Sequence, residues 1–258
     1  MDTLTPHRAT LFDEVASTYH DIRPDYPAAV FEQVLCAASL PSDGRILEIG
    51  CGTGKATLPF ASRGLQILCL EPGSNLAAAA RIRLKDFPLV QVLNMKFEQW
   101  PLQRENFDLV VSAQAFHWVD RTVRLPKTAS ALKRSGHLAL IWSVPLISDS
   151  PLGGELDRVY RIHAPELIKM TPTAIIELES EINAAGLFDE LHISRFLWSA
   201  TYDSTRYLAL LDTYSDHRLL PATTRTALFA AVGSVIDDAG GAMVVPYETV
   251  LFTAQVRR

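Results

Sequence analysis

Three glycines occupy alternate positions directly after an apolar run, in the stretch Ile46-Leu47-Glu48-Ile49-Gly50-Cys51-Gly52-Thr53-Gly54-Lys55. Glycine is needed where the backbone turns tightly and approaches a ligand without a Cβ atom, and a helix that begins after such a turn offers its N–H groups to that ligand. The alternative is a tight turn without a ligand, for which three glycines would cost backbone entropy without a compensating contact. The pattern therefore favours a ligand-binding turn.

Two nucleotide-binding patterns fail at particular residues of this turn. A dinucleotide fingerprint that starts at Gly50 requires glycine at position 55, where the chain has Lys55. A phosphate-binding loop that ends in Gly54-Lys55 requires glycine at 49 and serine or threonine at 56, and the chain has Ile49 and Ala56. The turn therefore follows neither pattern.

A carboxylate stands about 20 residues after the glycine turn, where the second apolar run ends in Leu70-Glu71-Pro72. At the tip of the neighbouring strand, a carboxylate can accept hydrogen bonds from both hydroxyls of a ribose. The alternative is an ordinary exposed acid at a strand end. Together with the glycine turn, Glu71 favours a ligand that contains adenosine.

Alternating strand and helix patterns must position these residues. Short, nearly continuous apolar runs predict strands at 45–49, 66–70, 89–93, 107–112 and 137–142, with helical segments at 55–63, 77–85 and 123–133 between them. This order predicts an open, mostly parallel, doubly wound α/β sheet. A ligand is then expected at the carboxyl ends of the strands.

The remaining residues have more helical patterns, with Pro and Gly at the ends of segments. Helices are expected at about 152–163, from Thr171-Pro172 to Gly186, at 203–213 and at 221–237, and strands at 191–198 and 247–256. We interpret about 146–185 and 199–245 as helical cap insertions over the carboxyl edge of the sheet. Residues 1–258 would then form a single domain.

The quoted residues resemble one known family, the class I S-adenosylmethionine-dependent methyltransferases. The similarity lies in 48–54, in Glu71 and in the strand Phe107-Asp108-Leu109-Val110-Val111-Ser112, and it looks closest to small-molecule enzymes of the trans-aconitate or ubiquinone/menaquinone type. The resemblance implies a Rossmann-like, mostly parallel seven-stranded sheet whose last strand is antiparallel. It covers 12–143, a cofactor-binding core with an N-terminal lid that includes Phe12, Asp13, Ala16, Tyr19 and Arg23-Pro24-x-Tyr26-Pro27.

The resemblance implies that S-adenosylmethionine is the cofactor, with its methionine part on the glycine turn and its ribose on Glu71. Adenine is expected after the third strand, where Lys96 occupies the place of a common acid and Phe97 either borders the adenine or packs in the core. The expected cofactor contacts are Tyr19, Arg23, Glu48, Gly50, Cys51, Gly52, Gly54, Glu71, Pro72, Lys96, Phe97, Gln114 and Phe116.

His117, between Phe116 and Trp118, is the candidate catalytic residue after the fourth strand. It suits a general base or a wall of the pocket, and the third alternative is a purely structural residue. Methyl transfer is an in-line displacement, which proximity and alignment can accelerate without a base. The expected substrate pocket comprises Tyr26, His117, Trp118, Tyr214 and His217, although 212–218 also reads as a solvated turn.

Composition narrows the class of partner. The 258 residues carry a net charge of −5, which disfavours nucleic acid and anionic membrane surfaces. The cysteines Cys36, Cys51 and Cys69 have neither disulfide nor metal-site spacing. No metal and no apolar signal segment is expected, and a cytoplasmic monomer or homodimer is the simplest setting.

The sequence thus predicts methyl transfer to a small-molecule acceptor with release of S-adenosylhomocysteine. Two alternatives stay open at this point. One is a catalytically inactive S-adenosylmethionine-binding module that acts through partners. The other is a nicotinamide-dependent oxidoreductase, which Lys55 disfavours.

Overall fold

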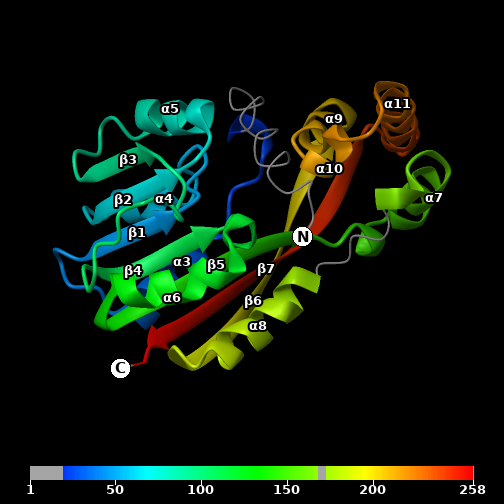
Figure 1. Ribbon diagram of the computed structural model, residues 1–258. Coiled ribbons are helices and arrows are strands. Elements are labelled where there is room, and N and C mark those ends of the chain that lie inside the picture. Colours follow the sequence, from blue (N-terminus) through cyan, green and yellow to red (C-terminus); the bar gives the residue numbers. More distant parts are fainter. Residues whose placement is uncertain (1–19, 168–172, 258) are drawn as a thin grey trace. The chain divides into compact units, whose positions relative to one another are not determined.

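The computed structural model describes residues 20–167 and 173–257, which group into two compact units (Figure 1). Unit 1 takes its described residues from 1–24, 144–173 and 197–248, and unit 2 from 25–143, 174–196 and 249–258. Strands β5, β6 and β7 each contribute residues to both units.

Seven strands form one sheet in the order β3-β2-β1-β4-β5-β7-β6. They are β1 (Arg45–Ile49), β2 (Gln66–Glu71), β3 (Val90–Asn94), β4 (Phe107–Ala113), β5 (Leu132–Pro145), β6 (Phe188–Asp203) and β7 (Ala242–Val256). The pairs β1–β2, β1–β4, β2–β3 and β4–β5 are parallel, and the arrow of β7 runs opposite to that of β4 in Figure 1. The predicted fold class is confirmed.

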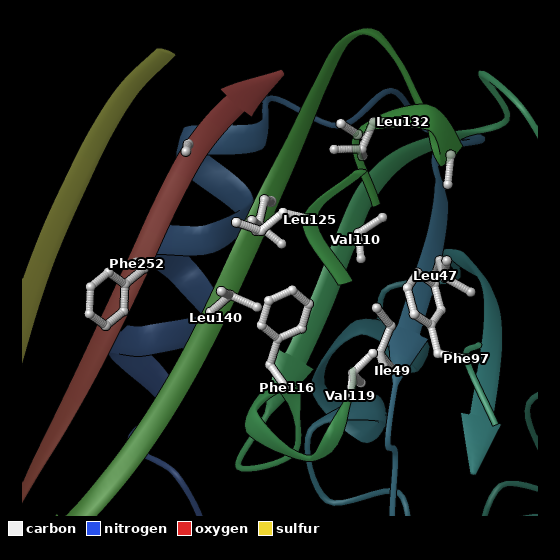
Figure 2. Packing of buried hydrophobic residues seen from close by; sticks show 14 of the residues in the cluster. Leu47, Ile49, Phe97, Val110, Phe116, Val119, Leu125, Leu132, Leu140 and Phe252 are labelled. Carbon is white, nitrogen blue, oxygen red and sulfur yellow. The ribbon is translucent and has the colours of Figure 1, made fainter. Parts of the chain in front are cut away.

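Helices cover both faces of the sheet within unit 2. They are α3 (Ala28–Ala38), α4 (Thr57–Ala61), α5 (Ser74–Arg83), α6 (Arg121–Ala131) and α8 (Thr173–Ala185). Residues of α6 and α8 pack with strand residues such as Leu47 and Leu140 in one buried cluster, part of which Figure 2 shows. Residues of α3, α4 and α5 pack with Ile46 and Ile141 in another. Successive strand residues therefore face different helices, which explains their continuous apolar runs.

Three elements of unit 2, α6, β5 and α3, differ from the sequence-based expectation. Helix α6 ends at Ala131 and β5 begins at Leu132, because Leu132 already pairs with Phe107 ahead of an irregularity in the register. Helix α3 was not predicted, although its buried residues Val30, Phe31, Val34 and Ala38 have helical spacing.

Unit 1 contains α7 (Gly153–His163), α9 (Ser204–Asp212), α10 (Ser215–Arg218) and α11 (Ala222–Asp238) around a core rich in tyrosine. Asp203 caps α9 by accepting from the Arg206 N–H at 2.7 Å, and α11 follows Pro221, as the sequence predicted. Leu178 and Ile182 of α8 lie in a buried cluster of unit 2. The cap insertions at 146–185 and 199–245 stay a prediction.

One side-chain hydrogen bond in unit 2 closes a long stretch of chain. The hydroxyls of Ser143 and Thr249 lie 2.6 Å apart and are separated by 106 positions in the sequence.

Within 20–167 and 173–257, no helix combines the length and the hydropathy that a membrane crossing requires.

Candidate functional site

The glycine turn follows β1. All three of its glycines have left-handed backbone conformations, and the space next to Gly50 differs from that next to Gly52. Gly50, Gly52 and Gly54 have φ angles of +71°, +57° and +88°, a region that L side chains rarely adopt. A Cβ at Gly50 would lie 2.3 Å from the Cβ of Ala115, whereas a Cβ at Gly52 would meet no atom within 4 Å. Gly50 therefore admits the turn after β4, and Gly52 leaves an open cradle.

Glu71, the last residue of β2, is hydrogen-bonded directly to the glycine turn. Its Oε2 accepts from the Gly52 N–H at 2.8 Å and its Oε1 from the Gly73 N–H at 2.9 Å. The Asn94 side-chain amide donates to the Glu71 carbonyl at 2.9 Å, and the Met95 N–H donates to the same carbonyl at 3.0 Å. The carboxyl ends of β1, β2 and β3 thus meet at Glu71, through both its carboxylate and its backbone carbonyl.

Glu48 is a second carboxyl group in the same unit, and it is 1% exposed. Burial raises its pKa to about 7, helped by the charge of Glu71 and opposed by hydrogen bonds from Thr57 and Cys69. The Cys69 thiol donates to Glu48 Oε2 at 3.7 Å. Near pH 7 this carboxyl is therefore partly protonated, unlike an ordinary surface glutamate.

The buried cysteines beside Glu48 are neutral. The hydrogen bond between the Cys51 and Cys69 side chains, together with burial, raises the pKa of the Cys51 thiol. The pKa of Cys69 is also raised. Its hydrogen bond with Cys51 is the largest single effect and lowers the pKa, but burial and the charge of Glu48 together raise it by more. Cys51 therefore lines the glycine turn as an uncharged side chain.

The turn after β3 holds the two residues expected near adenine. Lys96 is exposed, whereas Phe97 is 3% exposed and its ring stacks on Trp100 at a centroid distance of 6.1 Å. Figure 2 shows Phe97 beside Leu47 and Ile49. Its ring therefore packs in the core, which was one of the two alternatives, and a contact through its backbone N–H stays a prediction.

The turn after β4 begins at Gln114, whose φ of +57° is left-handed. Two hydrogen bonds hold this conformation, from the Gln114 N–H to the Ile141 carbonyl at 2.9 Å and from its Nε2 to the Ser143 carbonyl at 2.6 Å. Phe116 follows and is fully buried near Leu140 (Figure 2). A cofactor contact at Phe116 would therefore involve its backbone.

His117 lies in a short 3₁₀ helix, Phe116–Trp118, and is exposed to solvent. Its ring lies 4.7 Å from the Trp118 ring and 6.3 Å from the Trp142 ring, between centroids. Neighbouring side chains that displace water, and the charge of Arg124, lower the pKa of His117 to about 4. The imidazole is therefore neutral at pH 7.

The other expected site residues lie elsewhere. Tyr26 belongs to unit 2 and packs edge-on against Phe31, with 6.0 Å between ring centroids. Arg23, Tyr214 and His217 belong to unit 1. Tyr19 and the lid residues before it lie outside the described residues.

The three site residues in unit 1 take part in a network of aromatic and polar contacts. The Arg23 guanidinium lies 4.2 Å from the Tyr214 ring centroid. The Tyr160 hydroxyl is 2.8 Å from His217 Nε2, and Asp216 Oδ1 is 2.8 Å from His217 Nδ1. His217 is 6% exposed, so the expected solvated turn is instead part of a packed core at this residue.

Sequence reasoning missed several residues that shape these turns. Asn94 and Ala115 follow the apolar parts of their strands and carry no pattern of their own. Lys127 donates three hydrogen bonds of 2.6–2.9 Å to backbone carbonyls of the turn after β3. The only signal for Lys127 or Arg124 was a cation on a helix that otherwise has buried apolar positions.

Comparison with known proteins shows which family this site resembles. Residues 47–140 match a family described as a methyltransferase domain, and this stretch includes the glycine turn, Glu71 and the turn after β4. This stretch is therefore similar to methyltransferase domains that use S-adenosylmethionine. Among the residues that the structure describes, no group of three metal-ligating side chains accompanies it.

Alignments with two curated relatives are longer than the stretch that matches the family. The uncharacterized methyltransferase Rv3342 of Mycobacterium tuberculosis is 33% identical over 132 residues, which is 51% of each chain. The uncharacterized methyltransferase C25B8.09 of Schizosaccharomyces pombe is 27% identical over 219 residues, 84% of each chain. Our chain thus aligns with about half the length of the Mycobacterium protein.

A solved structure shows the same fold. Phosphoethanolamine N-methyltransferase 2 of Haemonchus contortus, in complex with phosphomonomethylethanolamine and S-adenosylhomocysteine, has a TM-score of 0.59 and 15% identity. The alignment covers 100% of our chain and 60% of the Haemonchus chain. At this identity the similarity concerns the fold alone.

Proposed function

We propose that the protein binds S-adenosylmethionine in unit 2 and transfers its methyl group to a small-molecule acceptor, releasing S-adenosylhomocysteine. The observation that carries the proposal is the hydrogen bond between the Gly52 N–H and Glu71 Oε2. It joins the two sequence features that predicted the cofactor, and it lies in the stretch that matches the methyltransferase family.

The residues present fit such a cofactor. The space next to Gly52, where a Cβ would meet no atom within 4 Å, suits the methionine part. A carboxylate has about four acceptor sites, so Glu71 can accept from ribose hydroxyls as well as from the two amides that hold it. Since β3 follows β2 in the sheet, adenine would reach the turn that begins at Met95.

The bound cofactor would supply an activated methyl group on a cationic sulfur. The chain's contribution is to bind and align, which can provide much of the acceleration of a displacement reaction. Glu71 and Glu48 are buried acidic groups of this part of unit 2. Since Glu48 is partly protonated near pH 7, it is mainly the negative charge of Glu71 that favours a cationic ligand. The left-handed Gln114 directs the chain after β4 so that Ala115 contacts Gly50.

We assign His117 to the wall of the reaction centre. A general base works best when its pKa is near the working pH, whereas the pKa of His117 is lowered to about 4. Its neutral ring can accept a hydrogen bond from a donor group of the methyl acceptor. Trp118 beside it adds an aromatic face. An aromatic face attracts a cation such as a sulfonium.

Two observations support a small acceptor. The net charge of −5 provides no overall positive field for a nucleic acid. The Haemonchus neighbour is crystallised with a small phosphorylated amine. We therefore infer a small-molecule acceptor rather than a polymer.

Calorimetry tests the cofactor assignment. The full chain should bind S-adenosylmethionine and S-adenosylhomocysteine, and NADH should show no binding under the same conditions, because Lys55 replaces a glycine that the dinucleotide pattern needs. The proposal would be overturned if neither S-adenosylmethionine nor S-adenosylhomocysteine bound to the folded protein.

Turnover separates an enzyme from a binding module. A library of small alcohols, amines, thiols and carbon acids is incubated with S-adenosylmethionine, and S-adenosylhomocysteine formation is measured. An active enzyme should accumulate the product with at least one acceptor class. Binding without product formation throughout the library would favour the inactive module.

A further inference from the structure

Two ion pairs connect α6 and α8 within unit 2, one helical turn apart, and they differ in burial. The side chains of Arg121 and Glu177 are 66% and 52% exposed. Those of Arg124 and Glu181 are only 5% and 21% exposed. Exposed pairs contribute little to structure, whereas removing one partner of a buried pair leaves an uncompensated charge at high cost.

Arg124 also contacts the turn after β4. Its Nε donates to Glu181 Oε1 at 2.7 Å and its Nη2 donates to Glu181 Oε2. The remaining Nη1 donates to the carbonyl of Phe116 at 3.2 Å, and the guanidinium lies 5.3 Å from the Phe116 ring centroid. Such a planar fork holds its partners in one orientation.

The carbonyl that Arg124 holds belongs to the 3₁₀ helix that carries His117. The Phe116 carbonyl also accepts from the Val119 N–H at 3.2 Å, and the Ala115 carbonyl accepts from the Trp118 N–H at 2.9 Å. At its other end this turn contacts the glycine turn, where Ala115 occupies the space that a Cβ of Gly50 would need. A shift of the Phe116 carbonyl would therefore move His117.

We propose that Arg124, oriented by Glu181, is a positioning residue for the turn from Ala115 to Val119 and for His117 on it. The inference rests on the proposed function in that His117 lines the reaction centre. It also gives α8 a role in the proposed site. Glu181 belongs to α8, which lies outside the stretch 47–140 that matches the family. The same cation contributes to the low pKa of His117, which makes the histidine a reporter.

The test compares Arg124→Met with its matched control, Arg121→Met, in the full chain. The His117 imidazole signals are assigned by NMR with His117→Asn and titrated. In Arg124→Met the pKa of His117 should move upward toward 6.5, its ordinary value, and the Trp118 and Val119 amides should exchange at least about tenfold faster. In Arg121→Met neither quantity should change.

A second comparison covers the case in which Arg124→Met fails to fold. Glu181→Gln keeps the shape of the partner but removes its charge, so the uncompensated arginine should lower the pKa of His117 further, and Glu177→Gln should not. Equal effects of the two glutamine variants, or a loss of stability with unchanged His117 titration and amide exchange, would overturn the proposal.

These measurements need neither acceptor nor methyl donor. Calorimetry of the wild-type protein with S-adenosylhomocysteine is run alongside them. If that compound does not bind while Arg124→Met still moves the His117 titration and speeds exchange of the Trp118 and Val119 amides, the proposed function fails and the positioning role stands. If it binds and Arg124→Met leaves His117 unchanged, the positioning role fails alone.

Discussion

In unit 2, the groups assigned to the cofactor are backbone amides and carboxyl groups near the ends of strands, whereas the polar groups of unit 1 are side-chain hydroxyls and an imidazole in a packed core. The Gly52 amide and Glu71 are the example in unit 2. In unit 1, Tyr160 bonds to His217, and the hydroxyls of Tyr202 and Tyr247 lie 2.9 Å apart.

This difference explains why one unit has a recognisable sequence and the other does not. A backbone cradle requires glycine at fixed positions, and such a requirement leaves a motif. A network of side-chain hydroxyls needs only residues that meet after folding, at any spacing in the chain. Unit 2 can therefore be recognised from its residues, while the polar core of unit 1 needed the structure.

The largest effect that tests the backbone side of this comparison is expected at Gly50. Gly50→Ala would place a Cβ 2.3 Å from the Cβ of Ala115 and would strain a left-handed residue. The unfolding free energy should fall by about 3 kcal/mol or more, measured by urea denaturation. Gly52→Ala, with nothing within 4 Å, is the control and should lose only about 1 kcal/mol. Equal losses would contradict the different roles of the two glycines.

Glu48 should give unit 2 a distinctive pH dependence. Its folded-state pKa of about 7 lies above the ordinary value of 4.5, so its favourable contribution is complete below pH 4.5 and is lost as the pH rises through about 7. Between pH 4.5 and 8 the wild-type unfolding free energy should fall by about 3 kcal/mol relative to Glu48→Gln. Parallel pH curves for the two proteins, from urea denaturation, would show that Glu48 is ionised throughout.

Glu71→Ala tests the side-chain contribution to the cofactor site. The variant should bind S-adenosylhomocysteine more weakly by about 1.5 to 3 kcal/mol, because charge-assisted hydrogen bonds to ribose are lost. Calorimetry provides the measurement, and Glu71→Gln, which keeps one acceptor oxygen, should fall between the variant and the wild type. Unchanged affinity in Glu71→Ala would remove this acid from the site.

The smallest effect is expected for Tyr160→Phe in unit 1. Loss of one hydroxyl that bonds to His217 should cost about 1 kcal/mol of unfolding free energy. The affinity for S-adenosylhomocysteine should stay at the wild-type value, since the proposed cofactor contacts of the described glycine turn and Glu71 lie in unit 2. A clear loss of cofactor affinity would contradict the assignment of cofactor binding to unit 2 alone. Tyr202→Phe is the matched control for removal of a tyrosine hydroxyl.

The parts of the fold that could be predicted are those where one local requirement dominates. The runs at β1, β2 and β4 are apolar because both faces of the sheet are covered. The start of β5 escaped prediction because Lys133, which belongs to the predicted helical segment 123–133, and Arg134 and Ser135 after it are only partly buried or exposed and form no apolar run. Arg124 could not be assigned because its partner Glu181 lies 57 positions away.

The hydrogen bond between Ser143 and Thr249 bears on the order in which the chain folds. Its partners are 106 positions apart, and the entropy lost in closing a loop grows with the length of that loop. Contacts between distant segments also slow folding. We therefore expect β1, β2, β3 and β4 to associate early, while the C-terminal strand joins last. A growing chain would hold its glycine turn well before the final residues leave the ribosome.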